Sequence, residues 1–229
     1  MAGDPEFEIR ACCAAGADRG VGITEPIVSG DFQHLARGPV LAAVPSQPDD
    51  ATAHHEAGHA AIAFGLGGTI RQVRIAHPGQ VEYDGALGDA DRIAISYAGP
   101  SAEHAARRWE ITLGQRDEEE FLDRAAACSL GSCDICVMAL FASRLASTTE
   151  TDPRQHFRAG QMRANALVRL PPIKRSITAL AAALMERPII DGPEAEAILS
   201  QFLERGELAA MEANDAFENP RRNGGHDRR

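Results

Sequence analysis

The segment AHHEAGHAAIA at positions 53–63 constrains this chain most, because it combines a helical composition with the pattern HExxH. Residues four apart on an α-helix lie one turn up the same face, about 6 Å apart. His55 and His59 can therefore bind one tetrahedral zinc ion through their ring nitrogens. Glu56 points to the side of that face, where a general base can reach a metal-activated water. The pattern predicts a helix built around a catalytic zinc ion, and the alternative is two surface histidines without a metal.

The residues around this pattern favour a buried metal helix. Asp49 and Asp50 precede it and suit a helix N-terminus, and we expect Thr52 to cap the helix. Small residues on the helix would let another backbone approach closely, and they are Ala57, Gly58, Ala60, Ala61 and Ala63. Three glycines should then end the helix, at positions 65, 67 and 68.

Two histidines are too few for a catalytic zinc site, which takes three protein ligands and keeps one position open. The downstream candidates for the third ligand are Glu103, His104, His156 and Asp134, the last at the start of an expected helix. A glutamate would give a gluzincin-like site, and His156 would give a three-histidine site. The residues by themselves leave this choice open.

Four segments resemble one known family in the same order along the chain. AHHEAGHA at 53–60 resembles the active-site helix of the FtsH-type proteases, the membrane-anchored, ATP-driven zinc peptidases of bacteria and organelles. AGPSAEH at 98–104 is similar to that family's GGRAAEE segment, and GSCDI at 131–135 to its GASNDL segment, with one residue fewer after the glycine. LAAAL at 180–184 followed by IDGPE at 190–194 is similar to the closing helix, turn and helix of the family. The resemblance covers roughly residues 45 to 205.

This resemblance implies a mainly α, zincin-like peptidase domain with a small β-hairpin or short sheet near the active site. It implies one zinc ion per chain, bound by His55, His59 and Asp134, with Glu56 as the catalytic base. The resemblance also implies that Glu103 is an acid that supports the metal ligands and is not itself a ligand. The chain departs from the family at position 133, where a cysteine replaces the usual asparagine.

Other parts of the FtsH-type proteases are missing from the sequence. The single lysine, Lys174, lies in no Gly-x-x-x-x-Gly-Lys-Ser/Thr segment, so we expect no ATPase module and activity without ATP. No apolar run of about 18 residues is present, and the N-terminus has no signal-peptide pattern, so we expect a soluble domain without membrane insertion. The expected substrates are unfolded or short polypeptides, and a homo-oligomer or a separate ATPase partner stays open.

Charge and cysteine content narrow the classes of partner and the cellular compartment that we expect. A net charge of −10 argues against nucleic acid as the main partner. Five cysteines without a secretory signal suggest reduced thiols and a cytoplasmic protein. Cys133 and Cys136 have the spacing of a redox or metal motif, but no second pair accompanies them. We therefore favour packing roles for Cys128, Cys133 and Cys136.

The chain divides into an arm, a domain and a tail. We expect residues 1–48 to form an extended or partly disordered arm. Residues 4–7 resemble a translated cloning linker, so residues 1–7 are expected not to belong to the natural protein. The peptidase-like domain is expected at 49–216 and a mobile polar tail at 217–229. Residues 69–84 predict a hairpin turning at 77–79, which either pairs with extended substrate or only covers the core. Further helices are expected at 90–98, 100–109, 117–128, 132–147, 153–170, 172–187 and 193–205.

Two functions of different classes follow from this pattern. The first is an ATP-independent zinc metalloendopeptidase, and the second is a non-catalytic binding or scaffold protein with the same fold. Glu56 favours the enzyme, because a scaffold has no physical need for a base beside the metal. An oxyanion-stabilising residue stays unassigned, with four candidates: Tyr83, Tyr97, His104 and His156.

Overall fold

The computed structural model describes residues 50–75, 79–107, 115–126 and 133–218. These form eight helices and one three-stranded sheet, which confirms a mainly α fold with a short sheet. The elements are α1 Asp50–Gly65, β1 Thr69–Arg74, β2 Gln80–Asp84, α2 Asp89–Arg107, α3 Gln115–Ala126, α4 Asp134–Thr149, α5 Pro153–Val168, α6 Pro171–Glu186, β3 Ile189–Asp191, α7 Gly192–Leu199 and α8 Glu207–Glu218. The predicted arm, and the part of the predicted tail from 219 onward, lie outside the described residues.

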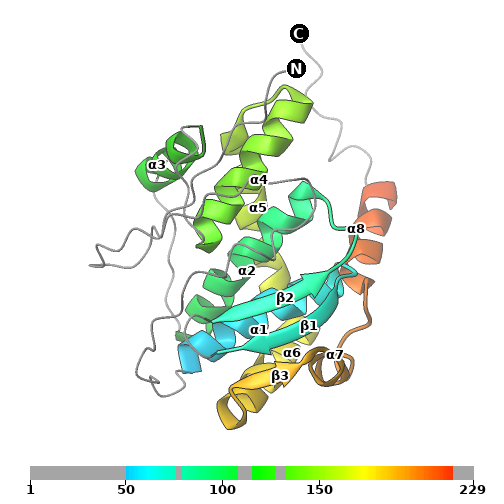
Figure 1. The fold of residues 1–229 in the computed structure, drawn as a ribbon. Helices are drawn as coiled ribbons and strands as arrows, with labels where there is room; N and C mark the ends of the chain where they lie inside the picture. The colour runs from blue at the N-terminus through cyan, green and yellow to red at the C-terminus, as the bar shows by residue number, and fades with distance from the viewer. Residues whose placement is uncertain (1–49, 76–78, 108–114, 127–132, 219–229) are drawn as a thin grey trace, which may run out of the picture.

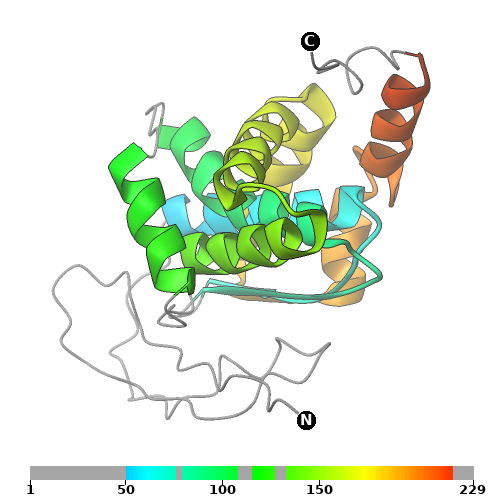
Figure 2. The ribbon, with the colours of Figure 1, turned by 90° about the horizontal axis from the view of Figure 1, so that it is seen from above.

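Helix α1 lies at the centre, between the sheet and the other helices (Figure 1). The sheet covers one side of α1, and α2 and α6 pack along its other sides. Seen from above, the sheet stands edge-on below α4, with further helices behind (Figure 2). Both layers cover α1, which is why most of the helix is buried.

Small residues let α1 sit this deep, as the sequence predicts. A Cβ atom on Gly58 would lie 2.6 Å from both Ala102 Cβ and Ala98 O of α2. The helix ends at Gly65, and Gly67 follows with a φ of 100°, a conformation that favours glycine. The expected cap at Thr52 is wrong, because the helix already begins at Asp50 and Thr52 lies inside it.

The predicted hairpin is present as β1 and β2, an antiparallel pair. Val73 pairs with Val81 and Ile70 with Tyr83, which places these apolar side chains toward α1. Most of the predicted turn, residues 77 and 78, lies outside the described residues. A third strand, β3, pairs with the other edge of β1 and was not predicted, because three residues are too few to show a strand period.

Two helix predictions need correction. Pro100 was expected to begin a helix, but α2 continues through it from Asp89 to Arg107. Proline removes one backbone N–H, and the packing of α2 against α1, α4 and α5 offsets that loss. The helix expected at 193–205 ends at Leu199, and α8 follows after Gly206 and runs past position 217, where the tail was expected to begin.

The buried apolar side chains form two clusters. The first joins α1, the sheet, α6 and α7, and includes Ile62, Val73, Leu180 and Leu199. The second joins α2, α3, α4 and α5. Helix α2 contributes to both, so the residues at its centre lie between the two clusters.

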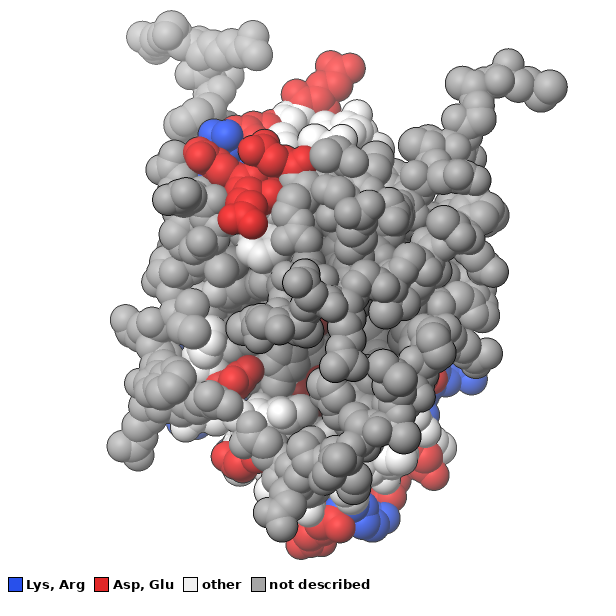
Figure 3. All heavy atoms as spheres, turned by 60° about the vertical axis from the view of Figure 1, so that its left-hand side comes forward, with Lys and Arg blue, Asp and Glu red and all other residues white. Residues whose placement is uncertain are grey.

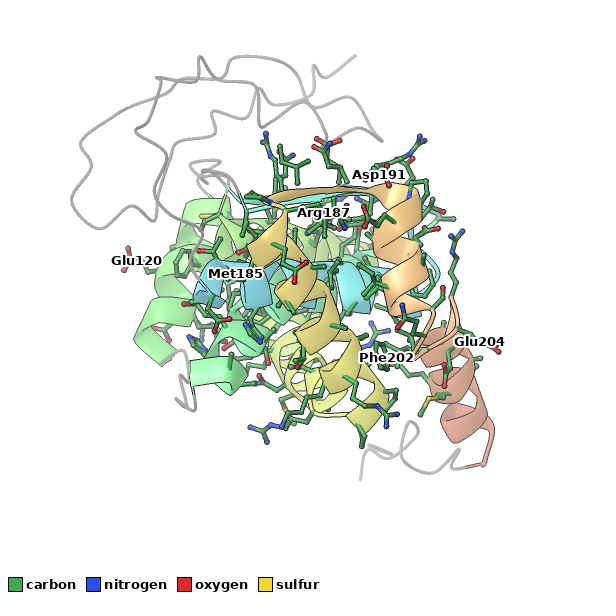
Figure 4. The ribbon with its side chains drawn as sticks, turned by 90° about the horizontal axis from the view of Figure 1, so that it is seen from below. Glu120, Met185, Arg187, Asp191, Phe202 and Glu204 are labelled. Carbon is green, nitrogen blue, oxygen red and sulfur yellow. The ribbon has the colours of Figure 1, made fainter. Side chains whose placement is uncertain are left out.

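The C-terminal part of the domain is joined to the sheet by side chains. Asp191 caps α7 by accepting a hydrogen bond of 2.9 Å from the amide of Glu194. Arg187 pairs with the Glu194 carboxylate close to that cap, beside β3 (Figure 4). Glu196 accepts from the amide of Ile70 at 2.9 Å, which ties α7 to the first residues of β1.

Acidic side chains are unevenly distributed over the described surface (Figure 3). Acidic side chains gather in the upper part of one face, with few basic ones beside them (Figure 3). Within the described residues, the helices lack the combination of length and apolar character that a membrane span requires.

We expect Glu150→Gly to stabilise the protein. Glu150 ends α4 with a φ of 55°, a left-handed conformation that costs a residue with a Cβ about 1 kcal/mol. The variant should gain about 0.5–1 kcal/mol in the free energy of unfolding, measured by urea denaturation. Glu186→Gly, in the right-handed last turn of α6, is the matched control and should lose a similar amount. Equal losses in both variants would contradict the prediction.

Candidate metal centre

The structure brings His55 and His59 of α1 together with Asp134, the first residue of α4. His55 Nε2 lies 2.8 Å from Asp134 Oδ2, and His59 Nε2 lies 3.3 Å from Asp134 Oδ1. One ligand atom from each of the three residues lies within 4.8 Å of the others. Among the described residues this is the only such group of histidine, cysteine and acidic side chains that could hold a metal ion.

Helix α2 fixes the orientation of both imidazole rings. His55 Nδ1 lies 3.2 Å from Glu103 Oε2, and His59 Nδ1 lies 2.7 Å from the backbone oxygen of Ile95. Both acceptors favour a proton on Nδ1, so Nε2, which is turned toward Asp134 in each ring, would be the ligand atom when a metal is bound. Glu103 therefore stands behind His55, in the supporting position that the resemblance implies.

The dimensions of this group fit a tetrahedral zinc ion. Bonds of about 2.0–2.2 Å place tetrahedral ligand atoms about 3.3 Å apart. The nitrogen–oxygen distances of 2.8 and 3.3 Å, which run to different oxygens of Asp134, are close to that value, while the three ligand atoms span up to 4.8 Å. Two imidazoles and a carboxylate are also a donor set that zinc commonly takes in catalytic sites.

The space under the rings is kept open by Gly99 of α2. A Cβ atom at this position would lie 2.2 Å from His59 Nε2 and 2.7 Å from His55 Cδ2. Both distances are far below van der Waals contact, so a side chain there would displace both rings. The absence of a Cβ atom at position 99 therefore allows both rings to take the positions that a metal site requires.

When no metal is bound, the two histidines hold positive charge beside the Asp134 carboxylate. Burial disfavours the charged form of His55, but hydrogen bonds to Asp134 and Glu103 outweigh burial and raise its pKa to about 10. Burial likewise acts against the charge on Asp134, but the neighbouring His59 and His55 hold its pKa well below the usual range. The Asp134 carboxylate thus stays ionised between two imidazoles and attracts positive charge.

Glu56 lies beside the ligands in a different environment. Its relative exposure is only 6%, and burial raises the pKa of its carboxyl above the usual value, although His59 and His55 oppose this. A carboxylate with a raised pKa is a stronger base. The start of β2 lies against this carboxylate, because a Cβ on Gly79 would be 2.3 Å from Glu56 Oε1.

The other candidates from the sequence lie elsewhere or have other partners. His156 is on the surface, where its Nε2 bonds to Thr151 Oγ1 at 2.6 Å. The Tyr97 hydroxyl accepts a 2.9 Å hydrogen bond from Gln161 of α5. His104 does not belong to the metal-capable group. Tyr83 is half-buried on β2, and burial, with the negative charge of Asp134, raises the pKa of its hydroxyl.

The two cysteines beside Asp134 do not join the metal-capable group. Cys136 is fully buried in the cluster formed by α2, α3, α4 and α5, and Cys133 packs against that cluster. This arrangement agrees with packing roles. Cys128 lies outside the described residues.

Two features of the site were missed by the sequence reasoning. The Ile95 carbonyl is a backbone atom, and no residue type signals its role. Gly79 was predicted only as part of a turn, although its contact is with Glu56. A glycine directly before a strand was the one signal that could have drawn attention to position 79.

No protein-family model and no curated protein sequence matches the chain.

Proposed function

We propose that this protein is a zinc metalloendopeptidase that hydrolyses unfolded or short polypeptides without ATP. The observation that carries the proposal is the convergence of His55, His59 and Asp134 beside the nearly buried Glu56. The resemblance of four segments to the FtsH-type peptidases supports it independently of this geometry.

Each residue of the site has a definable task in that reaction. When bound, zinc would act as a Lewis acid that activates a water molecule and polarises the peptide carbonyl. His55, His59 and Asp134 would hold the ion, and α2 fixes the two rings through Glu103 and Ile95 O. Glu56 would take the proton of the attacking water and return it to the leaving amine.

The sheet offers a place for the substrate backbone. Within the described residues β2 is an edge strand in the order β2-β1-β3, and Gly79, directly before it, lies next to Glu56. An extended peptide can add to the edge of a sheet through backbone hydrogen bonds, which do not depend on sequence. A broad preference for unfolded chains would follow from this mode of binding.

The non-catalytic scaffold remains the second candidate function. It would need the same fold, but it gives no reason to bury an ionisable carboxyl beside a cation site. A scaffold would gain stability from an uncharged residue at position 56, because burying a carboxylate is costly. The Glu56 environment therefore favours the enzyme, acting either alone or with a separate ATPase chain that supplies substrate.

The direct test is cleavage of fluorescently labelled casein without ATP. Zinc-loaded protein should release fluorescent fragments, protein treated with a chelator should not, and adding zinc back should restore the activity. Cleavage that is unchanged by the chelator would contradict a metallopeptidase.

We expect the purified protein to bind about one zinc ion per chain, and expect Asp134→Ala to lose most of it. Asp134 contacts both Nε2 atoms, whereas Glu103 contacts Nδ1 of His55, on the far side of that ring. Glu103→Ala should keep the ion at saturating zinc, with an affinity lowered about 10-fold. Metal content after desalting, measured by inductively coupled plasma mass spectrometry, distinguishes the two. Equal occupancy in both variants would argue for another third ligand.

A further inference from the structure

Gly79, directly before β2, lies against the carboxyl group of Glu56. A Cβ atom at this position would lie 2.3 Å from Glu56 Oε1, 3.0 Å from its Cδ and 3.2 Å from its Cγ. These three atoms of one side chain are the nearest neighbours of that position. The backbone at the start of β2 is thus shaped around the Glu56 carboxyl group.

This contact differs from the one made by Gly99. Gly99 comes from α2 and faces the rings of His55 and His59, whereas Gly79 precedes β2 and its three nearest neighbours all belong to Glu56. Two glycines on separate elements therefore contact the two functional parts of the site separately. A change at position 79 should act on the base and leave the metal ligands in place.

The strand resists displacement better than the carboxyl group does. Gln80 and Val81 pair with Arg74 and Val73 of β1, and Val73 is fully buried against α1. Moving the start of β2 would disturb this pairing and the core beneath it. The Glu56 carboxyl group lies at the end of a side chain and can turn about its own bonds. An added methyl group at position 79 would therefore turn the carboxyl group away.

We propose that Gly79 is a positioning residue for the catalytic base: the missing side chain at the start of β2 lets the Glu56 carboxylate stand beside the metal site. This inference rests on the proposed peptidase function. Any larger residue at position 79 displaces the carboxylate while His55, His59 and Asp134 keep their places.

The experiment compares Gly79→Ala with Gly88→Ala, in wild-type and Glu56→Gln backgrounds. A Cβ on Gly88 meets only Asp91 Oδ2 at an ordinary 3.7 Å, so this variant is the matched control. Gly79→Ala should lower kcat about 10- to 100-fold with KM and zinc content unchanged, because misplacement of a reacting group by about 1 Å costs up to about 100-fold. Gly88→Ala should retain wild-type kcat. In the Glu56→Gln background, Gly79→Ala should cause no further loss, because it acts only through Glu56.

A crystal structure of zinc-loaded Gly79→Ala provides a readout without activity, and should show the Glu56 carboxyl group turned from its wild-type position. An unmoved carboxyl group, an unchanged kcat or a further loss in the Glu56→Gln background would each overturn the role of Gly79. If the wild type shows no hydrolysis at all, the peptidase proposal fails. The role of Gly79 in placing the carboxyl group is then judged by the crystal structure alone.

Discussion

Glu56→Gln should lower peptide hydrolysis about 100- to 10,000-fold while the protein keeps its zinc ion. Glutamine has nearly the same volume as glutamate and keeps its polar contacts, but it cannot accept the proton of the attacking water. Because Glu56 is nearly buried, little bulk water is available to replace it as a base. A fluorogenic unfolded substrate measures the rate, and metal analysis on the same samples measures zinc content.

The matched control for this prediction is Glu120→Gln. Glu120 is an exposed residue of α3, so the same chemical change there should leave hydrolysis and zinc content at wild-type values. Wild-type activity should also be independent of added ATP, because the sequence contains no P-loop. If the wild type and Glu56→Gln share the same trace activity while both hold zinc, the scaffold function replaces the enzyme.

Local pattern was enough to predict part of this site. The helical period alone places His55 and His59 on one face with Glu56 at its side, and the structure has this arrangement on α1. The small residues of the same segment predicted a close neighbour, which is α2. Such features depend on residues within one or two turns, so the sequence expresses them directly.

Long-range features were harder to predict. Asp134 lies 79 residues beyond His55, and only the resemblance selected it over Glu103, His104 and His156. The spacing of residues along one helix does not indicate which distant helix begins beside a given histidine. The path of α2 through Pro100 was missed for a similar reason, because packing on three neighbouring helices, rather than local preference, keeps that helix continuous.

Contacts made by backbone atoms could not be predicted from residue types. The Ile95 carbonyl that orients His59 belongs to a residue whose side chain indicates only burial. Strand β3 was missed because it has only three residues. Helix α8 was missed because no helix was predicted beyond residue 205. Such a candidate site is therefore predictable only in part: residue types and spacing give the histidine pair and the candidate base, while the fold gives the third side chain and the groups that orient the rings.

Gly99→Ala should reduce zinc affinity about 10- to 100-fold, the usual range for changes behind metal ligands. The new methyl group would lie 2.2 Å from His59 Nε2 and 2.7 Å from His55 Cδ2. Both rings would have to turn, yet each is held on its other side by a hydrogen bond from Nδ1 to Glu103 or Ile95 O. The ligand atoms would therefore leave tetrahedral positions. Isothermal titration with zinc measures the affinity, and the visible absorption of the cobalt-substituted protein reports the coordination geometry.

The control for Gly99→Ala is a second tight glycine away from the site. A Cβ on Gly160 of α5 would lie 2.0 Å from Ile93 Cγ2 of α2, so Gly160→Ala introduces a comparable clash between helices. Overpacking of this kind typically costs about 1–3 kcal/mol of stability, and here it should leave zinc affinity and the cobalt spectrum unchanged. The two variants separate a general packing defect from a defect in the metal site. If Gly99→Ala binds zinc as tightly as the wild type with an unaltered cobalt spectrum, the space under the two rings does not control the metal geometry. A loss of zinc affinity that is equal in both variants would show that helix packing, rather than the contact of Gly99 with the histidines, is responsible.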